Sequence, residues 1–130
     1  MNDSSQATET SYQEDASDSK PTVVPVTVTI SDTGNECSPN PVKVKKNKPT
    51  ELVFTFAPGT VGYVFDDPGA ITVDPPADGQ FGPSVTSDNG AKAILNDVAT
   101  KEGSFVYWVH VTHVQSGKHV VFDPTIDNER

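Results

Sequence analysis

Three histidines near the carboxyl end of the chain have side chains that could bind a metal ion: His110, His113 and His119. Imidazole nitrogens are ligands for zinc and copper, and a neutral imidazole also serves as a base. His110 and His113 form an H-x-x-H pair, which on a helix places two ligands on one side. On a strand, residues three apart point to opposite faces, so a shared metal ion requires a bulge. The pattern favours surface or partly buried imidazoles, and a copper or zinc site built from these histidines is the alternative.

The segment that carries the histidines is predicted to be a hairpin. Ser116-Gly117 has the composition of a two-residue loop. This loop places Val114 opposite His119, and His110 opposite Asp123. His110 and His119 then share a face but lie far apart along the ladder. The pairing of His110 with Asp123 would orient an imidazole for metal binding or base chemistry, although such a pair is more often a plain cross-strand charge pair.

No catalytic nucleophile is evident. Ser104 and Ser116 fall in predicted turns, where serine commonly forms local hydrogen bonds, so no Ser-His-Asp triad can be assembled. We therefore expect that the protein is not an enzyme.

Aspartates gather between the fourth predicted strand and residue 90: Asp66, Asp67, Asp74, Asp78 and Asp88. Hard oxygen ligands in a flexible loop suit calcium. Their spacing lacks the alternation and the terminal glutamate of an EF-hand loop. Solvated, turn-forming aspartates are the preferred interpretation.

Length, charge and cysteine content exclude several classes. The chain has 130 residues, enough for one domain, and a net charge of −9 at pH 7. The acidic charge argues against binding to nucleic acid and to anionic lipid, since no broad basic face is available. Cys37 is the single cysteine, so no intrachain disulfide forms. No apolar run approaches the ~20 residues of a membrane helix.

The chain begins with a polar, acidic segment, residues 1–22, which we predict to be a disordered tether ahead of a domain at residues 23–130. Met1–Lys20 lacks the apolar region of a signal peptide. The segment nevertheless looks like the tether that follows an export signal or a lipid-anchored cysteine in bacterial envelope proteins. A terminus without a role is the alternative. We expect a periplasmic or secreted protein.

From Val23 onward the apolar residues recur with a period of two, which predicts strands. The expected strands are Val23–Ile30, Val42–Lys45, Leu52–Phe56, Tyr63–Phe65, Ile71–Val73 and the hairpin at Gly103–Phe122. Residues 31–41 are predicted to be a turn-rich loop, and Ala91–Val98 fits either a strand or one helical turn. The pattern predicts an all-β Greek-key sandwich of about seven strands.

The order of these segments resembles the cupredoxin family. "VTVTISD", "PVKVKKNKPTELVFTF" and "GYVF" are similar to the family's first strands, and "GSFVYWVHV" is similar to its penultimate strand. The similarity covers roughly Val23–Phe122 and depends on strand patterns rather than on a strict motif. It implies a cupredoxin-like Greek-key sandwich.

The resemblance also implies where a type 1 copper site would lie, and its ligands are missing. The early histidine position falls near Gly62-Tyr63, and the cysteine position is Val109. The second histidine position falls near Thr112, with His113 beside it, and the axial position is near Gly117. Because the thiolate is essential to such a site, we do not expect blue-copper electron transfer.

We therefore expect a non-enzymatic, exported binding or structural domain on a cupredoxin-like scaffold that has lost its copper site and has no cofactor. Its partner would be an unidentified protein or small ligand, and we expect a monomer. One alternative is a periplasmic metal-handling protein that binds copper or zinc through His110, His113 and His119. Another is an immunoglobulin-like adhesion or assembly module that captures partners through a sheet edge.

Overall fold

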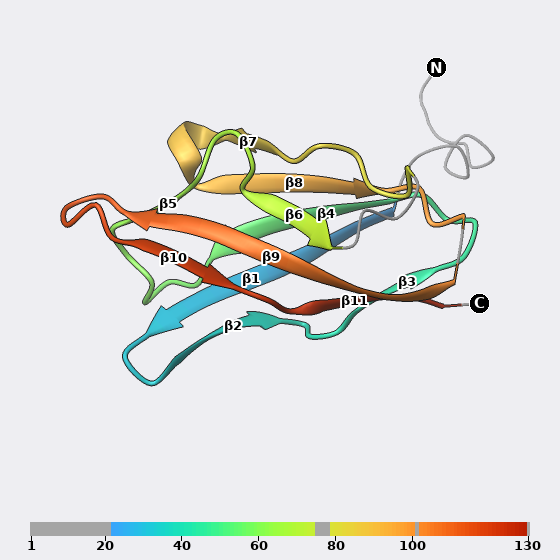
Figure 1. Ribbon diagram of the computed structural model, residues 1–130, viewed down its shortest axis with the longest axis horizontal. Helices are drawn as coiled ribbons and strands as arrows, with labels where there is room; N and C mark the ends of the chain where they lie inside the picture. The colour runs from blue at the N-terminus through green and yellow to red at the C-terminus, as the bar shows by residue number, and fades with distance from the viewer. Residues whose placement is uncertain (1–21, 75–78, 101, 130) are drawn as a thin grey trace, which may run out of the picture.

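The computed structural model describes residues 22–74, 79–100 and 102–129, and these residues form two β-sheets that pack face to face (Figure 1). Both sheets are mixed, since each contains one parallel pair of strands. The predicted all-β sandwich is confirmed at this level. The predicted tether at residues 1–22 lies outside the described residues except for Thr22, which begins the first strand. No helix among the described residues is long and apolar enough to cross a membrane.

The first sheet has five strands in the order β2-β1-β4-β8-β7. Its strands are β1 (Thr22–Ser31), β2 (Gly34–Ser38), β4 (Thr50–Phe56), β7 (Val85–Ser87) and β8 (Lys92–Asp97). A single 3-10 turn at Asp88–Gly90, η2, connects β7 to β8. β1 and β4 run parallel, and the other neighbours run antiparallel. Residues 91–98, left open between strand and helix by the sequence, therefore contain a strand.

The second sheet is built around one long strand. Its strands are β3 (Val42–Lys45), β5 (Tyr63–Phe65), β6 (Ile71–Asp74), β9 (Gly103–His113), β10 (His119–Phe122) and β11 (Thr125–Glu129). β9 pairs with β10 and β11 along one edge and with β5 and β6 along the other. β3 completes the sheet as the parallel neighbour of β11. β9 is thus a central strand, as its apolar residues on both faces predict.

The core lies between the two sheets, where alternate strand residues point inward. Phe54 of β4 and Tyr107 of β9 are fully buried, and their rings meet edge to face with centroids 5.6 Å apart. Val109 and Val111 follow Tyr107 on the same inward face. The period-two pattern of these strands specifies the buried face, because a slip of one residue would turn the apolar set toward solvent.

The structure contains eleven strands in its described part, more than the seven or so expected. β2 lies within the segment predicted to be a loop, and β11 lies beyond the last predicted strand. Both are polar, so apolar alternation does not reveal them. β2 is an edge strand in which Cys37 is the only buried residue, and β11 turns Ile126 and Asn128 inward. Pairing with β1, β3 and β9 makes these segments strands.

The predicted register of the C-terminal hairpin is wrong by two residues. Thr112 pairs with His119, and His110 pairs with Val121 rather than with Asp123. The loop has four residues instead of two, because the backbone N–H of His113 donates to the carbonyl of Lys118 at 2.8 Å. Gly117 closes this loop with a left-handed φ of 74° and donates its N–H to the His113 carbonyl. Because the pairing register differs by two residues, every side chain of the hairpin still points to the face that was predicted for it.

Gly90 provides a test of how η2 packs on β5. Its φ is +89°, and a Cβ added there would lie 2.8 Å from Val64 Cβ. We expect Gly90→Ala to lower the free energy of unfolding by about 1–3 kcal/mol, the usual range for such backbone strain. Urea denaturation measures this loss. Gly69→Ala is the matched control, because Gly69 has the same φ of +89° and nothing lies within 4 Å of its added Cβ. Equal losses in the two variants would contradict the packing of η2 against Val64.

Candidate metal site

A break in one edge of the second sheet positions an aspartate beside His110. β5 pairs with β9 through Phe65 and Val111, and β6 pairs through Ile71 and Val109. The five residues between β5 and β6 therefore loop out opposite the single residue His110. The backbone of His110 closes this loop: its carbonyl accepts the Asp66 N–H at 3.0 Å, and its N–H donates to the Ala70 carbonyl at 2.8 Å. Asp66 is thereby held at the start of the loop, next to the outer face of β9.

The hairpin register of the structure also brings His119 next to His110. His119 is opposite Thr112, so it is the diagonal neighbour of His110 on the outer face of β9 and β10. The centroids of the two imidazole rings are 6.2 Å apart. His110 and His119, expected to lie far apart along the ladder, are therefore neighbours.

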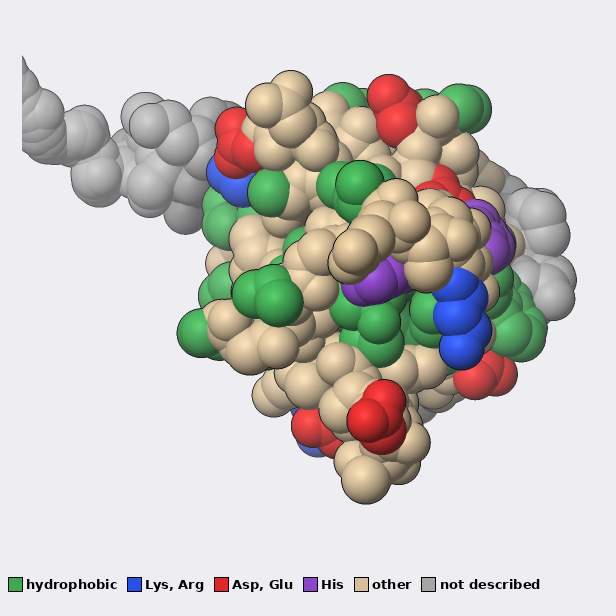
Figure 2. Space-filling view, turned by 90° about the vertical axis from the view of Figure 1, so that its left-hand side faces the viewer, with side chains coloured by type: hydrophobic (Ala, Val, Ile, Leu, Met, Phe, Trp, Pro, Cys, Tyr) green, Lys and Arg blue, Asp and Glu red, His purple; other side chains and the backbone are tan. Residues whose placement is uncertain are grey.

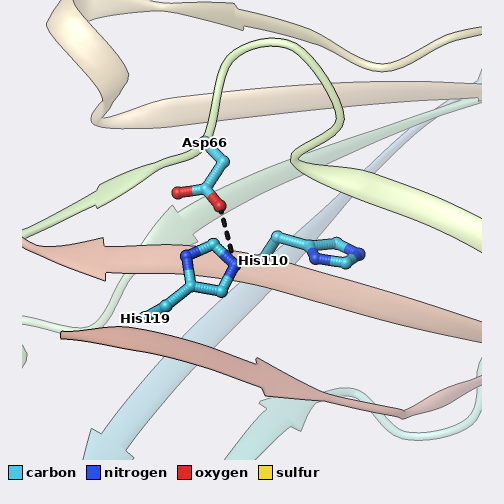
Figure 3. Close-up of side chains that lie close together, drawn as sticks. All are labelled: Asp66, His110 and His119. Carbon is cyan, nitrogen blue, oxygen red and sulfur yellow. Dashed lines mark ion pairs between the residues drawn. The ribbon is translucent and has the colours of Figure 1, made fainter.

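Asp66, His110 and His119 form a compact group of two imidazoles and one carboxylate (Figure 3). One potential ligand atom from each residue lies within 4.8 Å of the other two. His119 Nε2 is 3.1 Å from Asp66 Oδ2, and this ion pair is the dashed line in Figure 3. The Asp66 side chain is 20% exposed and the His119 side chain 52% exposed. An ion can therefore reach the group from solvent.

Two threonine hydroxyls bind the polar atoms that face away from the centre of the group. Thr72 Oγ1 is 3.0 Å from His110 Nε2. Thr112 donates its hydroxyl proton to Asp66 Oδ1 at 2.7 Å, and its oxygen lies 3.3 Å from His119 Nδ1. Imidazoles that bind metals usually donate their second ring N–H to an acceptor, and a threonine hydroxyl oxygen can serve as one. This network leaves three atoms for an ion: Asp66 Oδ2, His110 Nδ1 and His119 Nε2.

The electrostatic environment keeps His110 in the form that binds metals. Partial burial lowers the pKa of His110 below its usual value, and the neighbouring His119 imidazole lowers it further. The Asp66 carboxylate opposes this shift, because it favours the charged imidazolium. The net lowered pKa means that His110 is neutral at neutral pH. Its ring nitrogen then offers a lone pair without first having to lose a proton.

His113, the third sequence candidate, does not belong to this group. Its position in β9 places it on the opposite face from His110 and Thr112. Its ring packs against Tyr63 with centroids 4.9 Å apart, and its Nδ1 bonds the Ser116 hydroxyl at 2.8 Å. Figure 2 views this end of the sandwich and shows histidine side chains among hydrophobic ones. The two residues of the H-x-x-H pair therefore face different surroundings, as their spacing on a strand predicts.

No thiolate is available to this site within the described residues. Cys37 is buried in β2 of the other sheet, where burial raises the pKa of its thiol to about 11. The thiol therefore stays protonated at neutral pH. Val109, at the expected cysteine position, is fully buried in the core. Its side chain faces away from His110 and His119.

The three loop aspartates whose side chains are described, Asp66, Asp67 and Asp88, lie in separate surroundings. Asp66 joins the histidines, and Asp88 is exposed and lies 3.8 Å from the Lys92 ammonium. Asp67 lines a separate shallow pocket with Val64 and η2. The side chains of Asp74 and Asp78 lie outside the described residues. We predicted that these residues are solvated turn aspartates. That prediction did not include the contact of Asp66 with the two histidines, which depends on the tertiary structure.

Two histidines and one carboxylate are a donor set that first-row divalent metals bind, with coordination positions left open for water or another ligand. No protein-family model matches the chain, and no curated protein matches it. The chemistry of Asp66, His110 and His119 is therefore the basis on which a function can be inferred.

Proposed function

We propose that this domain is a non-enzymatic binding protein that holds a divalent transition-metal ion, Zn²⁺ or Cu²⁺. The ligand atoms would be Asp66 Oδ2, His110 Nδ1 and His119 Nε2. The observation that carries the proposal is the convergence of these three side chains, whose ligand atoms lie within 4.8 Å of one another. They come from three elements, the β5–β6 loop, β9 and β10, so only the folded chain brings them together.

The donor set favours zinc and copper over other ions. Imidazole is a borderline ligand that suits Zn²⁺ and Cu²⁺, whereas Ca²⁺ and Mg²⁺ take oxygen ligands. By the general order of divalent affinities, Cu²⁺ binds a given nitrogen and oxygen site more tightly than Zn²⁺. With no thiolate among its ligands, the site would hold copper without the character of a blue-copper centre.

The threonines distinguish this group from a simple surface ion pair. An ion pair between Asp66 and His119 needs neither His110 nor a fixed tautomer. Here Thr72 binds the outward nitrogen of His110, and Thr112 bridges the outward atoms of Asp66 and His119. The orientation of all three side chains before any ion is bound supports a metal site.

We further propose that the scaffold is a cupredoxin-like Greek-key sandwich and that the protein is exported. The resemblance of its strand order to cupredoxins supports the first point, together with the two-sheet architecture. The polar, acidic start of the chain supports the second. On such a scaffold the proposed metal lies on the outer face of β9 and β10, whereas the missing type 1 site includes the position of the inward Val109.

Calorimetric titration of the protein with Zn²⁺ and with Cu²⁺ tests the proposal. We expect one equivalent of each ion to bind, with ¹⁵N shifts of the His110 and His119 imidazoles on Zn²⁺ binding and paramagnetic broadening of the same signals on Cu²⁺ binding. Because an ion must displace protons from imidazoles, the affinity should fall as the pH is lowered from about 7.5 to about 5.5, across the usual histidine range. Ca²⁺ at the same concentrations is the control and should not bind there. The absence of saturable binding of either transition metal would leave Asp66 and His119 as an ordinary ion pair.

A further inference from the structure

A second polar pair lies in the interior, away from the proposed metal site. Asp97 is the last residue of β8 in the first sheet, and Asn128 belongs to β11 in the second. Their side chains are 1% and 3% exposed, and Asn128 Nδ2 donates to Asp97 Oδ1 at 3.3 Å. The pair thus joins the two sheets. Figure 1 shows these ends of β8 and β11 at the opposite end of the sandwich from the β9–β10 hairpin.

Each of the two side chains has one buried oxygen without a hydrogen bond. Asp97 Oδ2 and Asn128 Oδ1 have no partner among the described residues. Asp97 Oδ1 is satisfied, because it also accepts the Ala99 N–H at 2.8 Å. An ionised carboxylate and an amide oxygen are both acceptors, so they cannot bond each other. Leaving both oxygens unpaired in the interior destabilises the folded chain, and it does so more strongly where the group is charged.

We propose that Asp97 carries a proton on Oδ2 in the folded protein and forms a carboxylic acid–amide pair with Asn128. The proton supplies the donor that the two orphaned oxygens lack. Asp97 Oδ2 then donates to Asn128 Oδ1, while Asn128 Nδ2 continues to donate to Asp97 Oδ1. The two hydrogen bonds close a ring between β8 and β11 and fasten the C-terminal strand to the other sheet.

Neighbouring charges are not the cause of the proposed protonation of Asp97. The charged residues on adjoining segments are Lys43 and Lys45 on β3, Asp127 and Glu129 on β11 beside Asn128, Lys46 and Lys48 between β3 and β4, Glu51 on β4 and Glu102 before β9. Lys46 and Glu102 pair with each other at 3.5 Å near the surface. Burial is the largest cause of the raised pKa of Asp97, and the hydrogen bonds from Ala99 and Asn128 oppose the shift without cancelling it.

The raised pKa of Asp97 makes the acid–amide pair sensitive to rising pH. An aspartate whose pKa is higher in the folded chain than in the unfolded chain contributes stability at pH values below the unfolded pKa of about 3.9. That contribution is lost as the pH rises through the folded pKa. Deprotonation would place a buried charge beside the amide oxygen of Asn128. The attachment of β11 to β8 is therefore expected to loosen as the pH rises, whatever the state of the metal site.

Carbon-13 NMR of the aspartate carboxyl groups, recorded against pH on the full chain, tests the proposal directly. We expect the Asp97 carboxyl to keep its protonated shift as the pH rises past the usual aspartate pKa of about 3.9. If Asp97 ionises at or below that pH, the acid–amide pair does not exist.

Asp97→Asn provides a second, independent test. An asparagine places an N–H where the proposed acid proton lies, so it can form both hydrogen bonds with Asn128 without titrating. We expect the urea midpoint of the wild-type chain to fall as the pH rises, and we expect Asp97→Asn to lose this fall and to keep its stability at low pH. Asp88→Asn, the control, should retain the wild-type dependence. An unchanged dependence in Asp97→Asn would overturn the proposal, and the carboxyl titration decides the matter if this variant fails to fold.

Discussion

His110→Ala is expected to remove stoichiometric Zn²⁺ and Cu²⁺ binding from the domain. His110 is the ligand at the centre of the proposed site, since its backbone also closes the loop that positions Asp66. We expect the affinity to fall by more than about 100-fold, because the loss of a residue that merely orients a ligand already costs 10–100-fold. Calorimetry measures the affinity, and circular dichroism with urea denaturation shows whether the variant keeps the wild-type fold.

The control is His113→Ala, which removes the other histidine of the same strand. The ring of His113 contacts Tyr63 and Ser116 on the opposite face of β9. We therefore expect His113→Ala to bind both metals with wild-type affinity. The reverse outcome, in which His113→Ala loses binding and His110→Ala retains it, would refute the Asp66–His110–His119 site. Wild-type binding in both variants would place any bound metal elsewhere on the chain.

Phe54→Ala is expected to have the largest effect on stability. Phe54 is fully buried at the centre of β4, and its ring meets Tyr107 of the opposite sheet. Removing it deletes the main aromatic contact between β4 and β9 and leaves a cavity that β-strands on both sides cannot readily close. We expect the free energy of unfolding to fall by about 3–5 kcal/mol, as for other phenylalanine-to-alanine changes in cores. Urea denaturation followed by tryptophan fluorescence and circular dichroism measures this loss.

Val61→Ala is the matched control for the core variant. Val61 is 73% exposed, between β4 and β5, so its truncation removes little buried surface. We expect a change within about 0.5 kcal/mol, the usual range for surface substitutions. A loss of less than about 1 kcal/mol in Phe54→Ala would show that the two sheets do not pack through this residue, because phenylalanine-to-alanine truncations in cores cost about 3–5 kcal/mol.

The strands that bury an apolar face were predictable from the sequence. Val26 and Val28 in β1, and Leu52 and Phe54 in β4, alternate with more exposed residues along their strands. This alternation specifies both the strand and its buried face. β2 and β11 were not predictable in this way. Their residues are largely polar, and they are strands because neighbouring backbones supply hydrogen-bond partners.

The candidate site was only partly predictable. His110 and His119 were candidates because of their residue type, and the strand pattern correctly placed them on one face. Their proximity depends on the length of the hairpin loop, which a Ser-Gly pair in the sequence does not determine uniquely. Asp66 had no distinguishing signal among the acidic residues around it, because its position depends on the loop that opens opposite His110.

The sequence by itself determined the acidic composition and the mainly apolar-alternating strands, and it has Val109 where the resemblance to cupredoxins would place a cysteine. These properties are local: composition and a period of two need no knowledge of distant residues. Only the tertiary structure decided which side chains meet. The neighbours Asp66 and His110, 44 positions apart by their numbers, and Asp97 and Asn128, 31 positions apart, are brought together by strand pairing and sheet packing. Such contacts depend on register and loop length, and many sequences with the same pattern would satisfy the core without bringing these groups together.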